Sequence, residues 1–329
     1  MSALTECCKG HSGGEGHHSE GEGEPEPSKE LKLTEVIELD PAMKEVCVVG
    51  TADGFGKVTK IDGLQELIQL EDLTVRSCKI QKMDGLEGAN HLKRLELYDN
   101  QILLLELPPS LSQLRVLDLS YNLIRSTLAV ATCPLLEELY LAQNRLRCIE
   151  GLEGLSRLHK LDLGANRIRS MAGVEHCTNL EEIWLGKNKI TKIEGVKDLK
   201  RLKRLDVQSN RLTGIQGLGG LATLEELYIS NNAIEQEASG LEGLTALNTL
   251  DLSYNHLKVL AGIEGLAALE DLWLSRNKVE DFSALELLTG LPQLTCLYLE
   301  HNPVYKEFAY RKRIKEALPG LKQIDATPC

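Results

Sequence analysis

The sequence is poor in aromatic residues and in uninterrupted apolar stretches. Phe, Trp and Tyr make up only 4% of the 329 residues, so an enzyme core built around aromatic side chains is not expected. No stretch approaches the ~18 consecutive apolar residues of a membrane helix, and no basic start followed by an apolar segment opens the chain. We therefore expect a protein that has no membrane partner and is not secreted.

The chain also lacks an excess of positive charge and a regular cysteine pattern. Its formal charge is -12, whereas proteins that bind a phosphate backbone need clustered Lys and Arg, so we expect no nucleic-acid partner. The short basic run at residues 311–313 is interpreted as a solvated helix face. Nine cysteines occur without CxxC spacing, which predicts free thiols in a reducing compartment. No P-loop, GxGxxG, GxSxG or HExxH motif is present, so we expect no enzyme and no cofactor.

Residues 1–40 form an acidic N-terminal segment. They contain ten Asp or Glu against three Lys, with Gly, Ser, His and Pro between them. This composition is too polar to fold alone, so we expect a disordered tail. Within it lies a candidate metal cluster, whose members are Cys7, Cys8, His11, His17 and His18. Their spacing matches no standard zinc site, and we therefore predict no bound metal.

From about residue 58 the sequence repeats with a period of 22 residues. One unit, residues 136–157, reads LEELYLAQNRLRCIEGLEGLSR. The alternation in its first part predicts a short strand with one buried face, and the apolar residues at every third position afterwards suit a 3-10-like return segment. Because one unit cannot bury its own leucines, neighbours must stack. We predict an α/β leucine-rich-repeat solenoid with a parallel concave sheet, short helical convex segments and terminal caps.

The repeats are expected to occupy residues 58–302. An Asn follows each strand from residue 100 onward, where a buried amide satisfies backbone groups, and Cys78 takes this place in the first clear repeat. Residues 41–57 are expected to form an incomplete starting coil, and residues 303–329 a C-terminal cap, because open solenoid ends expose apolar surface. The cap is predicted to pack a short helix and a closing strand through Phe308, Ile314, Leu318 and Leu321.

The residue between the two leucines of each strand is the most informative position, because it points away from the core. In order, this column holds Thr74, Glu96, Asp118, Tyr140, Asp162, Trp184, Asp206, Tyr228, Asp251, Trp273 and Tyr298. Five of these eleven residues are aromatic and both tryptophans of the chain are among them. Alternate strands place successive rings ~10 Å apart, too far to stack on one another. Exposed rings in a contiguous row usually mark a protein-binding face.

An alternative explanation of this column needs no partner. One row earlier on the same face, charges alternate in sign between strands from Glu138 to Glu226, which predicts cross-strand ion pairs. Duplication of a 44-residue pair of repeats also explains why two repeat types alternate. It does not explain why both tryptophans occupy an exposed strand position, so we favour a binding face.

Several longer phrases resemble a known family. They are LELYDN (95–100), LGKNKITKIE (185–194), QSNRLT (208–213) and the ending LPGLKQIDAT (318–327). These phrases are similar to the regulatory subunit 7 family of protein phosphatase 1, whose members are non-catalytic leucine-rich-repeat subunits. The resemblance covers nearly everything after about residue 58, whereas the N-terminal tail shares only its acidity.

The resemblance implies that the concave face binds the catalytic subunit of protein phosphatase 1. The family's binding positions fall on Tyr140, Asp162, Trp184, Asp251, Asp271, Trp273 and Tyr298. With Asp206 and Tyr228 from the same column, they form the predicted partner-binding set. The family usually has Phe at the first and third of its positions and Glu at the second and fifth.

The resemblance also implies a nuclear and cytoplasmic location, control of phosphatase activity or maturation, and an effect on chromosome segregation. A third regulatory subunit is left open. The usual short docking motif for protein phosphatase 1, a basic residue followed by Val-x-Phe, is missing, because residues 278–282 read KVEDF and contain one residue too many. The alternative function is a general interaction scaffold, in a cilium, the cytoskeleton or a spliceosomal particle, without a phosphatase partner.

Overall fold

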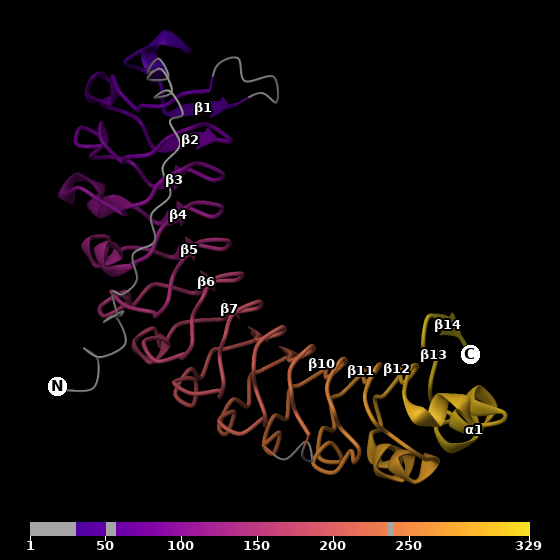
Figure 1. The fold of residues 1–329 in the computed structure, drawn as a ribbon. Helices are drawn as coiled ribbons and strands as arrows, with labels where there is room; N and C mark the ends of the chain where they lie inside the picture. The colour runs from indigo at the N-terminus through magenta and orange to yellow at the C-terminus, as the bar shows by residue number, and fades with distance from the viewer. Residues whose placement is uncertain (1–30, 51–56, 236–239) are drawn as a thin grey trace, which may run out of the picture.

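The computed structural model describes residues 31–50, 57–235 and 240–329. The chain winds into a curved solenoid, in which the strands line the inner side of the arc and the turns and short helices lie on the outer side (Figure 1). The strands form one sheet in chain order from β1 to β14. This arrangement is the leucine-rich-repeat solenoid predicted from the 22-residue period, so the predicted fold class is confirmed.

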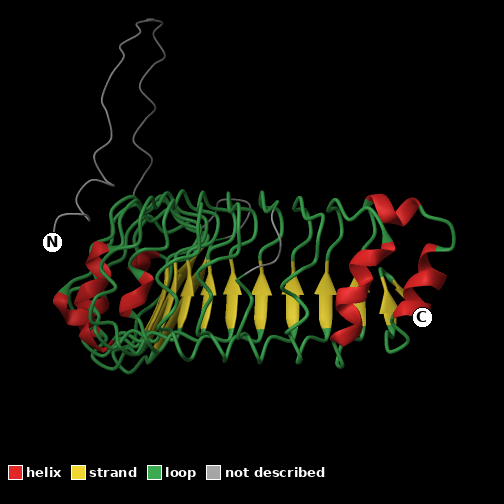
Figure 2. Cartoon of the chain, turned by 90° about the horizontal axis from the view of Figure 1, so that it is seen from below, coloured by secondary structure: helices red, strands yellow, loops and turns green. Residues whose placement is uncertain are grey.

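Each repeat contributes one short strand, and neighbouring strands pair in parallel without a shift. Leu139 of β5 stands opposite Leu161 of β6, which stands opposite Ile183 of β7. Figure 2 shows the strands as a row of arrows that point the same way. Their bounds are β1 Glu45–Val49, β2 Asp72–Arg76, β3 Arg94–Glu96, β4 Val116–Asp118, β5 Glu138–Tyr140, β6 Lys160–Asp162, β7 Glu182–Trp184, β8 Arg204–Asp206, β9 Glu226–Tyr228, β10 Thr249–Asp251, β11 Asp271–Trp273, β12 Cys296–Tyr298, β13 Gln323–Ile324 and β14 Thr327–Pro328.

The leucines of successive coils form one continuous core. Leu139, Leu161 and Ile183 are 0% exposed, as are the convex residues Leu158 and Leu202. Each coil buries its apolar residues against the coils on either side, because a single coil has no second layer of its own. The stability of the array therefore depends on contacts between neighbours.

A ladder of buried asparagines connects the coils. Asn166 Oδ1 accepts a hydrogen bond from the Leu146 amide at 2.9 Å, and its Nδ2 donates to the carbonyls of Leu141 and Leu163 at 2.9 and 3.0 Å. Equivalent bonds recur from Asn100 to Asn302, which confirms the predicted role of this position. The residue before each Asn is left-handed, with φ of 52° at Ala165, and this turns the chain out of the strand.

Only some of the return segments are helical. The 3-10 helices are η1 Leu33–Glu35, η2 Leu64–Glu66, η3 Pro109–Gln113, η4 Leu128–Thr132, η5 Val174–His176, η6 Phe282–Gly290 and η7 Pro303–Lys306. The other coils form open turns instead of the predicted helical segment. Within the described ranges, no helix is long and apolar enough to cross a membrane.

Residues 31–40 are folded, whereas the sequence predicts a disordered tail up to residue 40. Leu33 of η1 is 0% exposed, and Lys32 forms a parallel bridge with Lys60 of the first full coil. The assignment of residues 31–40 to a disordered tail is therefore wrong, because Leu33 supplies apolar surface that covers the end of the core. Residues 1–30, with the candidate metal cluster for which no bound metal is predicted, lie outside the described residues.

The C-terminal end is closed by α1 (Tyr310–Ala317) and by the antiparallel pair β13 and β14. Ile314, Leu318 and Leu321 are buried as predicted, whereas Phe308 is 93% exposed. Ala309 is left-handed at φ 58° and reverses the chain between Phe308 and α1, so that Tyr310 takes the buried place. The predicted packing of Phe308 is therefore wrong.

Replacing one ladder asparagine is expected to destabilise the solenoid. Asn166→Ala leaves the buried Leu146 amide without its acceptor, whereas the Leu141 carbonyl keeps the hydrogen bond from Asn144. An unsatisfied buried group costs about 1–3 kcal/mol, so we expect the free energy of unfolding in urea to fall by about 1–3 kcal/mol. Asn90→Ala is the matched control, since Asn90 is exposed and bonds only to the Gly88 carbonyl. An equal decrease in the free energy of unfolding of both variants would contradict a stabilising role of the asparagine ladder.

Candidate functional site

The residues between the strand leucines form one row along the concave face, which we call the concave lane. In register, Tyr140 of β5 lies beside Asp162 of β6, and Asp162 lies beside Trp184 of β7. Eight of the nine predicted partner-binding residues are neighbours in this lane: Tyr140, Asp162, Trp184, Asp206, Tyr228, Asp251, Trp273 and Tyr298. The ninth, Asp271, lies one row earlier on β11.

The five rings of the lane are partly exposed, whereas the leucines beside them on the same strands are buried. The alternation of side chains across each strand explains this difference, since one set enters the core and the other faces outward. Asp251 is the exception among the predicted residues, because it is only 8% exposed.

The last three rings touch one another. The ring centroids of Tyr228 and Trp273 are 6.3 Å apart, and those of Trp273 and Tyr298 are 6.1 Å apart. Tyr228 and Trp273 lie two strands apart, so for this pair the predicted ~10 Å separation is wrong. Asp251 lies between Tyr228 and Trp273, and its short side chain bends to the Ser253 amide, which leaves room for the two rings to lean together. The result is a contiguous aromatic cluster.

The aspartates of the lane have a structural role that the sequence did not reveal. Asp162 Oδ1 accepts a hydrogen bond from the Gly164 amide at 2.8 Å, two residues along the chain. The same bond occurs at the other aspartates of the lane, Asp118, Asp206 and Asp251. Burial raises the pKa of the carboxyl groups of Asp118, Asp162 and Asp206. These carboxylates thus combine an internal bond with a position on the concave face.

Charges in the row before the lane neutralise one another between β6 and β9, as the alternation predicts. Arg204 lies 2.7 Å from Glu226, and Lys160 lies 3.6 Å from Glu182. The Tyr228 hydroxyl donates to Glu226 at 2.8 Å, and burial, together with this carboxylate, raises the pKa of Tyr228 to about 12. At β11 the pattern changes, because Asp271 forms no ion pair within the part of the chain that the structure describes.

A second column, two positions after each lane residue, was not singled out from the sequence. The residues of this column form the floor of a groove at the carboxyl ends of the strands. We call this groove the strand-end trough. One wall is the concave lane, and the other is formed by the left-handed residues before each Asn. From β4 to β11 the floor residues are Ser120, Ala142, Gly164, Gly186, Gln208, Ser230, Ser253 and Ser275. Cavities of 440 and 430 Å³ open along the trough. Aligning the repeats would have shown that this column is mostly small.

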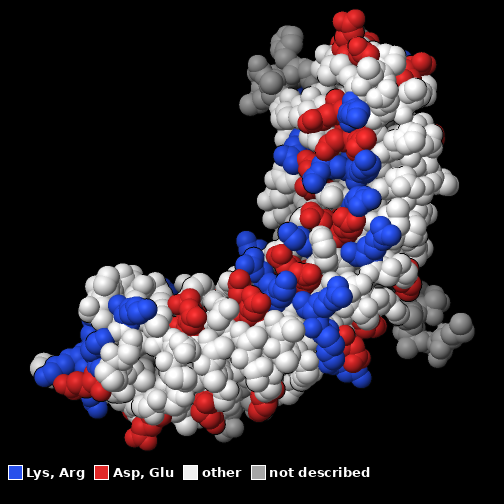
Figure 3. All heavy atoms as spheres, turned by 180° about the vertical axis from the view of Figure 1, so that it is seen from behind, with Lys and Arg blue, Asp and Glu red and all other residues white. Residues whose placement is uncertain are grey.

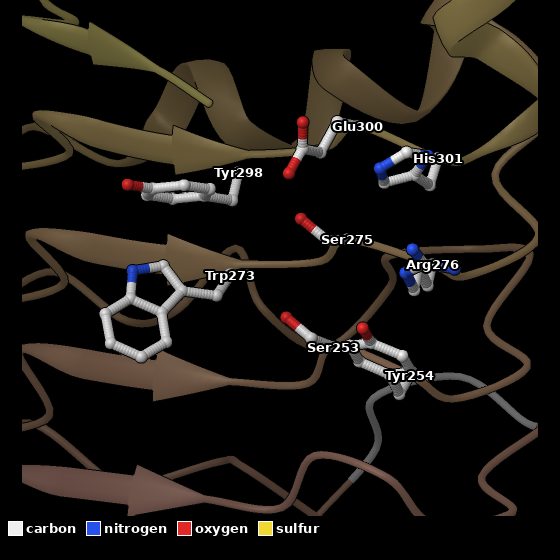
Figure 4. Close-up of a pocket in the computed structure, with 8 residues that line it drawn as sticks. All are labelled: Ser253, Tyr254, Trp273, Ser275, Arg276, Tyr298, Glu300 and His301. Atoms are coloured by element: carbon white, nitrogen blue, oxygen red, sulfur yellow. The ribbon is translucent and has the colours of Figure 1, made fainter. Parts of the chain in front are cut away.

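The end of the trough near β12 is the best-defined hollow. Figure 4 shows the side chains of Ser253, Ser275 and Glu300 in a line between two walls. Trp273 and Tyr298 form one wall, and Tyr254, Arg276 and His301 form the other. The Arg276 guanidinium lies 5.1 Å from the centroid of the Tyr254 ring, which holds it at the rim.

The basic run at residues 311–313 is only partly the solvated face that the sequence predicts. Arg311 donates to the carbonyls of Ile324 and Pro328 at 2.6 and 3.0 Å, and Arg313 lies 3.9 Å from the centroid of the Phe282 ring. Both therefore fasten the C-terminal cap.

Seen from behind, acidic and basic side chains are interspersed along the N-terminal arm (Figure 3). No group of three metal-ligating side chains occurs in residues 31–50, 57–235 and 240–329.

Two substitutions at Asp162 separate its hydrogen bond from its charge. Asp162→Ala removes the acceptor of the Gly164 amide, and we expect the free energy of unfolding in urea to fall by about 1 kcal/mol. Asp162→Asn keeps an acceptor but removes a carboxylate whose pKa is raised by burial. A raised carboxyl pKa makes the folded state less stable at neutral pH, so Asp162→Asn is expected to exceed the native chain in stability at pH 7.

This advantage is expected to shrink as the pH falls through the raised pKa towards the unfolded value of about 3.9, because the native carboxyl group is then neutral in both states. Asp198→Asn, at an exposed position, is the matched control. A constant difference between Asp162→Asn and the native chain across this pH range would show that burial of the charge is not its cause.

Comparisons with known proteins agree with this repeat architecture. The family described as Leucine Rich repeats (2 copies) matches residues 134–176, 178–220, 200–245, 222–267 and 245–287. Over 48 residues the chain is 52% identical to protein phosphatase 1 regulatory subunit 7 of Xenopus tropicalis and 46% identical to that of Homo sapiens. The matched segment is 15% of this chain and only 14% and 13% of those two relatives.

Solved structures are similar over most of the solenoid. An internalin (inlF) of Listeria monocytogenes has a TM-score of 0.75 at 23% identity, covering 86% of this chain and 80% of the internalin. A leucine-rich-repeat protein of Leptospira interrogans has a TM-score of 0.67 at 23% identity, covering 81% of this chain and 78% of that protein. The repeats, the stacked parallel strands and these likenesses show that the chain is a leucine-rich-repeat solenoid, a fold typical of non-catalytic interaction scaffolds.

Proposed function

We propose that the chain is a non-catalytic regulatory subunit that binds the catalytic subunit of Ser/Thr protein phosphatase 1 and controls its activity or maturation. The concave lane carries this proposal, because it displays partly exposed rings and carboxylates in one unbroken row. The local likeness to regulatory subunit 7 of this phosphatase supports the choice of partner. Under this proposal the protein acts in the nucleus and cytoplasm and affects chromosome segregation.

Docking is proposed to use the rings as anchors and the carboxylates to set orientation. Buried aromatic side chains usually carry most of the binding energy of an interface, and charge complementarity contributes specificity. Tyr228, Trp273 and Tyr298 already contact one another, so the partner would meet a preformed apolar surface. Asp271 beside this surface has no internal ion-pair partner among the described residues and is available to a basic group.

The arrangement of charge predicts where basic groups of the partner bind. Between β6 and β9 the outer row is neutralised by its own ion pairs, such as Arg204 with Glu226. At β11 the outer-row carboxylate of Asp271 has no such partner in the described part of the chain. We therefore infer that basic residues of the phosphatase contact the C-terminal half of the concave face.

Co-purification from native cells distinguishes the phosphatase from another partner. Recovery of the catalytic subunit by the native chain, and its loss with Trp184→Ala and Trp273→Ala, supports the proposal. Recovery of a ciliary, cytoskeletal or spliceosomal protein in place of a phosphatase would instead support a general scaffold. Assay of the recovered phosphatase before and after adding metal then separates inhibition from a role in maturation.

The two tryptophans are expected to be binding anchors and not supports of the fold. Trp184→Ala and Trp273→Ala should each weaken binding to the purified catalytic subunit by about 2 kcal/mol or more, because each removes a large ring from the contact surface. Calorimetry measures the affinity, and thermal unfolding checks that the solenoid remains intact.

Phe308→Ala is the matched control for these variants. Phe308 is a 93% exposed ring on the C-terminal cap, outside the concave lane. We expect its removal to leave the affinity unchanged. If both tryptophan variants bind the phosphatase as tightly as the native chain does, docking through the lane is refuted.

A further inference from the structure

We propose that the strand-end trough binds an extended, Lys- or Arg-bearing segment of a partner polypeptide, whose main-chain carbonyls accept hydrogen bonds from unpaired amides on the trough floor. This inference extends the proposed function, because the rings of the concave lane form one wall of the trough. It assigns a separate role to the floor, which none of the predicted partner-binding residues occupies.

The dimensions of the trough suit a single extended chain. Seven strand steps separate Ser120 on β4 from Ser275 on β11, a length of ~34 Å at ~4.8 Å per step. An extended segment of about eleven residues covers this length at ~3.1 Å per residue. The floor is mostly Ser, Ala and Gly, so a main chain can approach it closely. Large side chains close the two ends, since the ring centroids of Tyr98 and Tyr121 lie 4.9 Å apart near β3 and Glu300 follows β12.

Unpaired amides occur in the coils that carry rings. In the aspartate coils the lane carboxylate reaches the floor amide from the concave side, as Asp162 does at Gly164. Tyr140, Trp184 and Trp273 cannot cap the amide two residues along, because a ring has no acceptor placed there. In the described chain, the amides of Ala142, Gly186 and Ser275 accordingly have no hydrogen-bond acceptor. These three residues border the cavities, so a bound chain can reach them.

The spacing of two of these amides indicates the conformation of the bound segment. Ala142 and Gly186 lie two strands apart, which corresponds to ~9.6 Å. A polyproline II chain repeats its orientation every three residues, or ~9.3 Å, whereas a β-strand repeats every ~6.7 Å. The polyproline II repeat therefore matches the amides. Grooves that bind this conformation are lined with aromatic rings, and Tyr140 and Trp184 stand beside these two amides.

Charge favours a basic segment over an acidic one. Three lane carboxylates, those of Asp118, Asp162 and Asp206, line the concave-lane wall of the trough, and none forms an ion pair within the described ranges. The opposite wall contributes two cations, Lys187 and Arg276, and Arg276 is already stacked on Tyr254. Burial raises the pKa of the carboxyl groups of Asp118, Asp162 and Asp206, so a nearby cation would stabilise their charged form.

A displayed library of random peptides about twelve residues long, selected on the full chain, tests this inference. We expect the selected peptides to be enriched in Lys or Arg and in Pro. Their affinity for Ala142→Gln is expected to fall about ten-fold, because the longer side chain fills the trough. Gln208 occupies the same column, so the backbone accommodates Gln there. Ala222→Gln, at an exposed turn outside the trough, is the matched control and should keep native affinity.

A second variant tests the amide itself. Ala142→Pro removes one unpaired N–H without breaking an internal hydrogen bond, and we expect weaker peptide binding at an unchanged thermal unfolding midpoint. The inference is overturned if no peptides are selected, if acidic peptides are enriched, or if the selected peptides bind Ala142→Gln as well as the native chain. Phosphatase binding that depends on Trp184 and Trp273 would survive each of these outcomes, so the two proposals can fail separately.

Discussion

Zero-shift pairing between consecutive strands is the constraint on which the rest of the structure depends. Leu139, Leu161 and Ile183 stand opposite one another, and the asparagine ladder fixes each coil to the next through buried backbone groups. Residues at the same position of successive repeats therefore line up in a row across the coils. The core, the concave lane and the trough floor are three such rows, each specified by a choice made once per repeat.

The features that the sequence predicted correctly are those that follow from this periodicity, although the small residues of the trough floor were missed. The fold, the asparagine bonds and the neighbour relations in the lane needed only the 22-residue spacing and the alternation of a strand. Features that depend on the reach of a side chain could not be predicted. The contact between Tyr228 and Trp273 arises because Asp251 bends away between them, and the exposure of Phe308 arises from the left-handed Ala309. The ordering of Leu33 needed knowledge of the surface that it covers.

The lane aspartates show why a repeat position should not be assigned a single role. Asp162 closes a local turn and faces the concave side at the same time, so a change there alters both the turn and the charge of this face. The coils of Tyr140, Trp184 and Trp273 lack this internal bond and leave an amide unpaired among the described residues, whereas the Glu300 amide after Tyr298 donates to Asp325. Because acidic and aromatic residues alternate along the lane, hydrogen-bonded and unpaired backbone amides also alternate along this face. The side chains alone would not show this second alternation.

The left-handed position before each Asn accepts side chains of different kinds and can therefore vary during evolution. Its conformation is held by the asparagine that follows, as at Ala165, Lys187 and Arg276, with φ of 52°, 56° and 59°. Small, cationic and aromatic side chains all occupy this place without disturbing the core. Mutation at these sites can accordingly change the chemistry of one wall of the trough without touching the leucine core or the asparagine ladder.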